Sequence, residues 1–246
     1  MKQEGWKHLF RSLLLLTGFC MIAVLCRKPD QELFLSVDTV SLQNMEREDT
    51  VTMLKRAFYS EPISDALKER ITGVSFPPEE CSEIRYEDLC HIHVLHFNFD
   101  HEIQRGELIC NRIIAEDLLE IFWELFEEEY PIERIGLMEE YNGDDISSME
   151  DNNTSCFNYR LISGSSSLSA HSRGLAIDVN PLYNPCVSSA GIIQPQNGAA
   201  YADRSISFPY RIDREDLCYR LFTEHGFIWG GDWDDPKDYQ HFEYAK

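Results

Sequence analysis

The sequence has little positive charge and lacks several short motifs that mark common classes of enzyme. Its 246 residues include 22 lysines and arginines against 43 aspartates and glutamates, giving a formal net charge of −21. A chain this acidic repels polyanions, so nucleic acid is not expected as a partner. The motifs Ser-x-x-Lys and Gly-x-Ser-x-Gly, typical of two kinds of serine hydrolase, are absent. No internal repeat is evident, which favours one compact domain.

No pair of cysteines has Cys-x-x-Cys spacing, so a cysteine zinc site or a thioredoxin-type motif is poorly supported. Two of the eight cysteines, Cys20 and Cys26, lie in an apolar segment near the N-terminus. The other six are Cys81, Cys90, Cys110, Cys156, Cys186 and Cys218. An even number in a translocated domain permits disulfides, and buried free thiols are an equally good interpretation. Their pairing does not follow from the sequence.

Residues 1–28 are typical of a secretion signal or an N-terminal membrane anchor. Three basic residues against one acid precede an uncharged stretch over residues 12–26. The absence of an Ala-x-Ala cleavage site favours an uncleaved anchor, with residues 9–26 as a membrane tether, although a cleaved signal and a buried helix are both alternatives. We therefore expect an extracytoplasmic protein that is secreted, periplasmic or at the cell surface.

The rest of the chain divides into two regions. Residues 29–75 are polar and are expected to form a linker or stalk with short helices, and residues 76–246 to form one α+β domain. Alternating apolar residues predict a β-hairpin over residues 86–111, with its turn at Arg105–Gly106. Residues 112–130 place apolar side chains on one face and acids opposite, which predicts an amphipathic helix.

Shorter elements are expected to follow. They are a strand over residues 132–141, a turn over residues 142–145, an exposed loop through residues 151–154 and a central strand over residues 174–181. Residues 213–227 predict a helix with Asp213 as its N-cap and Gly226 at its end.

His171, Asp178 and His241 form a candidate set of metal ligands. A zinc hydrolase needs three protein ligands, usually imidazole or carboxylate, and an open fourth position. The spacing of His171 and Asp178 suits a histidine before a turn at Gly174 and an aspartate on the strand that follows. Because an unpaired buried carboxylate is costly, Asp178 needs a metal ion, a loop to cap, or pairing with Arg173.

Asp238 is the candidate catalytic base. It precedes His241 by three residues in Asp-Tyr-Gln-His, an offset that can hold a carboxylate beside a zinc-bound water. Rival carboxylates lie nearby at Asp232, Asp234, Asp235 and Glu243.

These residues also carry a family resemblance. Residues 169–178, Ser-Ala-His-Ser-Arg-Gly-Leu-Ala-Ile-Asp, match the Ser-x-His-x-x-Gly-x-Ala-x-Asp signature of the zinc D-alanyl-D-alanine carboxypeptidase family. Residues 229–243 resemble the closing motif of its L-alanyl-D-glutamate endopeptidase branch. The likeness covers roughly residues 110–244. It implies the fold shared by hedgehog proteins and D-alanyl-D-alanine peptidases, in which a small antiparallel sheet carries zinc and packs against helices.

The resemblance also assigns roles to single residues. It implies Zn²⁺ bound by His171, Asp178 and His241, with Asp238 as the base. Arg160 occupies the place of an arginine that binds and polarises the scissile carbonyl. Arg173 and Arg134 are weaker candidates for that role.

The expected function is a metallopeptidase of the cell wall. It would hydrolyse the peptide stem of peptidoglycan at a bond involving a D-amino acid, as a D,D-carboxypeptidase or an L-alanyl-D-glutamate endopeptidase, by attack of a zinc-bound water. The alternative is a non-catalytic cell-wall peptide-binding protein that retains the zinc site. Asp238 favours the enzyme, because a binding module has no need of a base.

Three further histidines lie close together at His91, His93 and His96. On a strand His91 and His93 share a face and His96 points the other way. This arrangement favours an exposed strand face over a second metal site.

Overall fold

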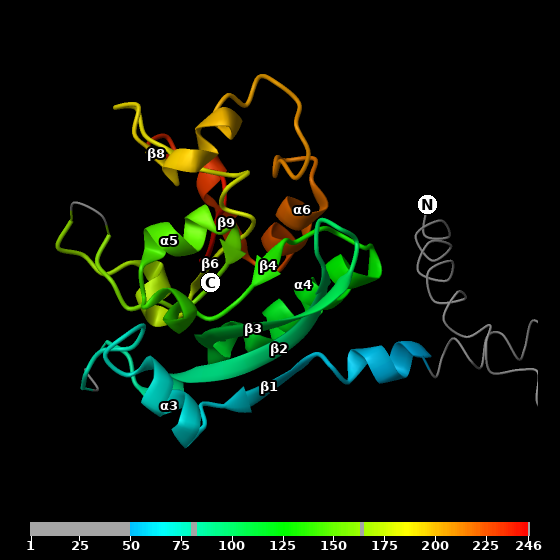
Figure 1. Cartoon of the computed structure of the whole chain (residues 1–246), viewed down its shortest axis with the longest axis vertical. Coiled ribbons are helices and arrows are strands. Elements are labelled where there is room, and N and C mark those ends of the chain that lie inside the picture. Colours follow the sequence, from blue (N-terminus) through cyan, green and yellow to red (C-terminus); the bar gives the residue numbers. More distant parts are fainter. Residues whose placement is uncertain (1–49, 80–82, 163–164, 246) are drawn as a thin grey trace, which may run out of the picture.

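The computed structural model describes residues 50–79, 83–162 and 165–245, with short sheets and helices around a common core (Figure 1). A helical segment over residues 50–55 precedes β1, and the α-helices after it are α3 (Asp65–Ile71), α4 (Ala115–Glu127), α5 (Asp145–Glu150) and α6 (Leu217–Glu224). The strands are β1 (Tyr59–Pro62), β2 (Leu89–Phe97), β3 (Ile103–Asn111), β4 (Arg134–Ile135), β5 (Asn153–Thr154), β6 (Ala176–Asp178), β7 (Cys186–Val187), β8 (Ile193–Gln194), β9 (Phe227–Trp229), β10 (Lys237–Asp238) and β11 (His241–Tyr244). The 3₁₀ helices are η1 (Tyr86–Asp88), η2 (Arg112–Ile114), η3 (Met138–Tyr141), η4 (Ala170–Arg173), η5 (Gln196–Tyr201) and η6 (Gly230–Asp232). Helices mixed with small, mostly antiparallel sheets confirm the expected α+β class.

The predicted hairpin forms, but its turn is displaced from the expected position. β2 and β3 pair antiparallel over nine positions, and the turn between them spans residues 98–102. The Asn98 side chain accepts a hydrogen bond from the backbone N–H of Glu102 at 2.8 Å, which closes the turn. The expected turn at Arg105–Gly106 was wrong, because Gly106 lies inside β3, where a side chain would collide with β4.

Helix α4 forms from the amphipathic pattern predicted over residues 112–130. Its buried side chains are Ala115, Leu118, Ile121, Phe122, Leu125 and Phe126. Most of them join one core cluster with Ile92 of β2, Ile177 of β6 and Phe242 of β11. A single core therefore connects this helix to the sheet of β1, β2 and β3 and to the sheet of β6, β11 and β9.

Residues 50–75 are packed elements, which differs from the linker expected there. β1 adds to the edge of the hairpin by pairing antiparallel with β2. Leu67 and Ile71 of α3 are buried in a second cluster with Leu89 and Ile109. Because the strand and the helix each contact the hairpin, this segment belongs to the same packed unit.

The remaining N-terminal predictions lie outside the described residues. These are the signal or anchor over residues 1–28 and the first part of the expected linker, residues 29–49. Within the described ranges, no helix combines the length and the apolar character that crossing a membrane requires. Five described cysteines are free thiols, namely Cys90, Cys110, Cys156, Cys186 and Cys218, and Cys81 lies outside the description.

The strand expected over residues 132–141 is reduced to β4, followed by η3. The loop expected to be exposed through residues 151–154 is largely buried and contains β5. The Asn153 amide explains the burial, since it donates to the Gly136 carbonyl at 3.1 Å and to Ser148 Oγ at 3.0 Å. Polar residues that suggest a surface loop are here hydrogen-bonded inside the molecule.

The N-cap of α6 also differs from the prediction. Asp216, and not Asp213, accepts a hydrogen bond from the backbone N–H of Cys218 at 2.8 Å. The Asp213 side chain instead accepts from the Arg211 guanidinium at 2.6 Å. The predicted glycine stop is present, because Gly226 follows the helix with a positive φ of 89°.

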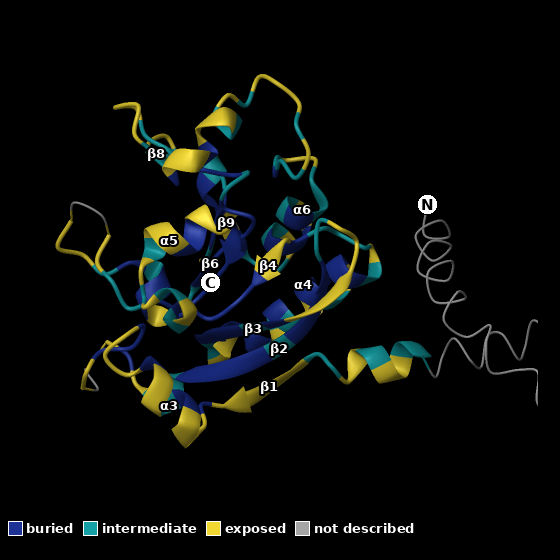
Figure 2. Cartoon of the chain, in the orientation of Figure 1, coloured by how far each residue is buried: buried dark blue, intermediate teal, exposed yellow. Residues whose placement is uncertain are grey.

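The C-terminal sheet has the order β6-β11-β9 and is largely buried (Figure 2). In its antiparallel register, His241 lies opposite Asp178 and Phe242 lies opposite Trp229. Successive strand residues point to opposite faces, so Phe242 enters the core while His241 and Glu243 share the other face.

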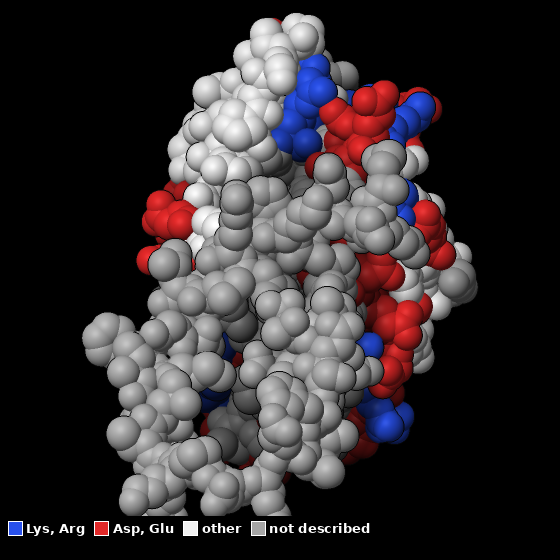
Figure 3. Space-filling model, turned by 90° about the vertical axis from the view of Figure 1, so that its right-hand side faces the viewer, with Lys and Arg blue, Asp and Glu red and all other residues white. Residues whose placement is uncertain are grey.

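A third small sheet, β10-β7-β8, places Asp238 opposite Cys186. On the face shown in Figure 3, acidic side chains form several groups among the described residues, with fewer basic ones between them. This charge distribution agrees with the acidic composition of the chain.

The turn at Gly174 joins the two halves of the first motif. Gly174 ends η4 with φ 65°, and a Cβ there would lie 2.6 Å from the backbone nitrogen of Asn111. The backbone N–H of Asn111 donates to the Gly174 carbonyl at 2.9 Å, so the turn is held against the end of β3.

We expect Gly174→Ala to destabilise the fold more than Gly191→Ala. Both glycines have positive φ, but a Cβ on Gly191 meets nothing within 4 Å. Both variants should lose roughly 1–2 kcal/mol from the left-handed backbone, and Gly174→Ala a further 1–3 kcal/mol or so from overpacking. Urea unfolding of the two variants measures the difference, and equal losses would contradict this account.

Candidate metal centre

The structure brings together the three residues predicted as metal ligands. His171 lies on η4, Asp178 ends β6 and His241 begins β11. All three side chains are buried. Antiparallel pairing of β6 with β11 places Asp178 opposite His241, and η4 brings His171 to the same place. The three side chains therefore lie together although they are far apart in the chain.

The donor atoms form a nearly equilateral triangle. Asp178 Oδ1 lies 3.0 Å from His241 Nδ1 and 3.3 Å from His171 Nε2, and the two nitrogens are 3.2 Å apart. Zinc bonds to nitrogen and oxygen are about 2.0–2.2 Å long, so ligand atoms in a tetrahedral site lie about 3.3 Å from one another. The three donors therefore fit a zinc ion without rearrangement of the backbone.

A backbone carbonyl sets the orientation of His171. Its Nδ1–H donates to the carbonyl of Cys156 at 2.5 Å, which leaves the lone pair on Nε2, the atom that faces the centre. Cys156 is held there because its neighbour Ser155 exchanges two backbone hydrogen bonds with Asp178.

Glu243 occupies the equivalent position beside His241. Its Oε2 lies 3.5 Å from His241 Nε2, and the two residues share one face of β11. A carboxylate on this side favours the proton on Nε2 and leaves Nδ1 free to bind a metal. Glu243 is therefore placed to orient the ring of His241 without binding the metal itself.

Electrostatics of the cluster favour a cation. Burial raises the pKa of Asp178, but His171 and His241 outweigh it and hold that pKa well below its usual range. Burial lowers the pKa of His241, yet Asp178 and Glu243 raise it to about 10. A metal ion must therefore displace a proton from His241, so metal affinity should weaken as the pH falls.

Asp238 lies beside this cluster on β10 and is half-buried. Burial raises its pKa to about 6, with His241 opposing the shift and Asp178 adding to it. Gln240 Nε2 donates to its Oδ1 at 3.1 Å. Gly230 makes the close packing possible, since a Cβ there would lie 2.9 Å from Asp238 Cβ and 3.3 Å from His241 Cβ.

The guanidinium of Arg160 pairs with Asp145 at 2.8 Å. Its backbone is fixed against η4, because the Arg160 N–H donates to Ser172 Oγ at 2.9 Å and that hydroxyl donates to the Arg160 carbonyl at 2.6 Å. The assignment of Arg160 to a substrate carbonyl stays a prediction. Of the weaker candidates, Arg134 is engaged by Glu140.

Two of the other carboxylates near the C-terminal motif have partners of their own. Asp232 pairs with Arg214 at 2.8 Å, and Asp235 accepts from the backbone N–H of Ser189 at 2.7 Å. Trp229 is buried in the core, whereas the half-exposed ring of Trp233 has its centroid 5.1 Å from that of His241. Trp233 therefore borders the centre.

Two groups that contact the centre were not predicted from the sequence. The Cys156 carbonyl is a backbone group, for which residue identity gives no signal. The second is Gln240, which donates to Asp238 two positions earlier in the chain. Its place inside the Asp-Tyr-Gln-His motif was the one available signal. The contact of Glu243 with His241 could have been predicted, because residues two apart on a strand share a face.

A carboxylate and two imidazoles with a neighbouring acid are groups that zinc hydrolases use in their active sites. Residues 163–244 match the family model described as D-alanyl-D-alanine carboxypeptidase. This match confirms the resemblance that the two motifs indicate, and it contains all three proposed ligands and Asp238. Searches against curated proteins and against solved structures gave no significant match.

We expect graded losses of zinc affinity when this centre is altered. Asp178→Asn removes a ligand and should weaken binding by more than about 100-fold, whereas Glu243→Gln removes an outer partner and should cost about 10- to 100-fold. Competition of Zn²⁺ against a chromophoric chelator measures both constants.

Glu224→Gln is the matched control, because Glu224 is an exposed residue at the end of α6 that pairs only loosely with Arg220. Its zinc affinity should equal that of the unaltered chain. If Asp178→Asn kept the zinc affinity of the unaltered chain, the measured ion would be bound at another place, which would contradict this assignment.

Proposed function

We propose that the chain is a zinc-dependent peptidase that hydrolyses the peptide stem of peptidoglycan at a bond involving a D-amino acid. The observation that carries the proposal is the triangle of His171, Asp178 and His241 with Asp238 beside it. The family match over residues 163–244 supports the peptidase class. The signal-like residues 1–28 support an extracytoplasmic location, where peptidoglycan is accessible, and a membrane tether over residues 9–26.

Zinc held by these ligands would supply a Lewis acid that activates water and polarises a carbonyl. Asp238 would accept the proton from the attacking water and pass it to the leaving amine. Its pKa of about 6 suits both steps near neutral pH. Because Gln240 donates to Oδ1, the second oxygen of Asp238 is the one proposed to exchange the proton.

Arg160 is proposed to bind the carbonyl of the scissile bond. The hydrogen bonds with Ser172 tie its backbone to the helical turn that carries His171. Its Nε is buried and has no hydrogen-bond partner among the described residues, so the guanidinium has a donor to spare beyond the pair with Asp145. A positive donor near the developing oxyanion would stabilise the transition state.

We expect Asp238→Asn to lose at least about 100-fold in kcat, since it removes a general base, while its zinc content stays unchanged. The assay incubates the zinc-loaded chain with a defined stem pentapeptide and identifies the products by mass spectrometry. Product masses also separate loss of the terminal D-alanine from cleavage after L-alanine.

Asp234→Asn is the control, because Asp234 is an exposed acid in the same segment and should leave kcat unchanged. If the zinc-loaded chain binds the pentapeptide without cleaving it, and Asp238→Asn behaves the same way, the non-catalytic wall-binding alternative replaces the enzyme.

A further inference from the structure

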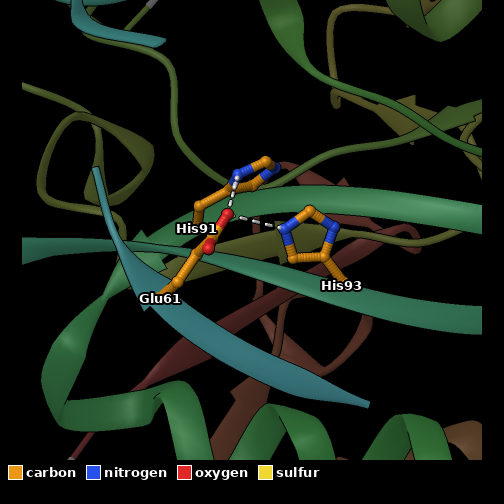
Figure 4. A group of neighbouring side chains, drawn as sticks. All are labelled: Glu61, His91 and His93. Atoms are coloured by element: carbon orange, nitrogen blue, oxygen red, sulfur yellow. Dashed lines mark hydrogen bonds and ion pairs between the residues drawn. The ribbon is translucent and has the colours of Figure 1, made fainter. Parts of the chain in front are cut away.

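A second group of side chains that could hold a metal ion lies on the N-terminal sheet (Figure 4). Glu61 of β1 lies opposite His91 of β2, and His93 lies opposite Glu107 of β3. His91 and His93 share one face of the strand, as the sequence indicates. The expectation of an exposed face was wrong for His91, which is 8% exposed.

His96 takes no part in this group. Its Nδ1–H donates to the carbonyl of Ile132 at 2.7 Å, and the side chain is buried on the other side of the strand. The third donor is instead Glu61, thirty residues before His91 in the chain.

The donor atoms lie at nearly the spacing of a zinc site. Glu61 Oε1 is 3.2 Å from His93 Nε2 and 3.6 Å from His91 Nδ1, and the three residues each offer one donor atom within 4.8 Å of the others. Tetrahedral zinc requires separations of about 3.3 Å. The distances from Glu61 to the two rings lie within about 0.3 Å of that value.

Glu107 lies against the opposite nitrogens of both rings. Its two oxygens are each 3.7 Å from a ring nitrogen, one from His91 Nε2 and the other from His93 Nδ1. A carboxylate near the outer nitrogen of a histidine supports a proton there when a metal occupies the inner nitrogen. His93 Nε2 donates to Glu61 Oε1 at 3.2 Å, and an ion bound to that nitrogen would displace this proton to the side of Glu107. The Tyr59 ring, stacked on His93 with centroids 4.4 Å apart, fixes the second ring further.

The surroundings of the two rings suit a cation. His91 is almost wholly buried, and Glu61 and Glu107 lie against opposite nitrogens of the ring pair. Two carboxylates beside two imidazoles supply negative charge that a divalent ion would offset.

We propose that Glu61, His91 and His93 form a second site for zinc or a similar divalent transition metal, with Glu107 as its outer partner. Two imidazoles and a carboxylate suit zinc in ligand type and number, and leave a fourth position for water. The Glu61 side chain is 48% exposed, so an ion can enter from solvent. Because β1 is an edge strand with exposed residues, the ion fastens it to β2.

The two sites have no residue in common and lie on different sheets. Zinc titration of the full chain, first stripped of metal with a chelator, therefore tests this site separately from the proposed peptidase. We expect two equivalents of Zn²⁺ for the unaltered chain. Glu61→Gln and His93→Gln should each keep one equivalent, and His241→Ala should keep the other.

Glu107→Gln should keep both equivalents but weaken one of them by about 10- to 100-fold. His101→Gln is the matched control, because His101 is an exposed histidine in the hairpin turn, 3.2 Å from Glu129, and should retain both. Glu61→Gln preserves the shape of a half-exposed side chain, so it decides the question even if His93→Gln fails to fold.

One equivalent in the unaltered chain that disappears in His241→Ala would overturn the proposal. Two equivalents of unchanged affinity in Glu61→Gln would overturn it as well, since the second ion would then lie elsewhere. If the unaltered chain binds two equivalents of Zn²⁺ but shows no peptidase activity, the proposed function is refuted and the second metal site still stands.

Discussion

The buried carboxylate of Asp178 is the constraint on which the C-terminal half of the structure depends. It lies between two imidazoles in a strand that is otherwise apolar, and each imidazole is within 3.3 Å of one of its oxygens. A buried charge without such partners would cost several kcal/mol. His171 and His241, the other two proposed metal ligands, are therefore also the partners that offset the cost of burying Asp178.

This constraint fixes the register of the C-terminal sheet. A slip of one residue between β6 and β11 would turn His241 to the opposite face and bring Phe242 out of the core. Burial of Phe242 and pairing of His241 with Asp178 thus select the same register. Packing and chemistry are satisfied by one arrangement of the strands.

The neighbouring backbone completes the centre. The close contact of Gly174 with the end of β3 holds the turn after His171, and the pairing of Ser155 with Asp178 places the Cys156 carbonyl on the outer nitrogen of that histidine. On the other side, Gly230 lets β10 approach closely enough to put Asp238 beside His241. Segments far apart in the chain each supply a contact that the others require.

The sequence predicted the parts of this arrangement that depend on residue type and spacing. The amphipathic helix, a strand that carries Asp178 and the cluster of His171, Asp178 and His241 all followed from such patterns, although the strand expected over residues 174–181 is shortened to β6. The Cys156 carbonyl did not, because a backbone group carries no residue signal. Glu61 did not either, because its partners are brought to it only by strand pairing across thirty residues. The hairpin turn was misplaced because Gly106 is required for packing and not for a turn.

The most direct test of the account is the position of a zinc ion in crystals of the chain, located by anomalous scattering at the zinc absorption edge. We expect a peak about 2.0–2.2 Å from His171 Nε2, Asp178 Oδ1 and His241 Nδ1. A zinc-loaded crystal with no peak at these three atoms, or with zinc on His241 Nε2 instead, would contradict it.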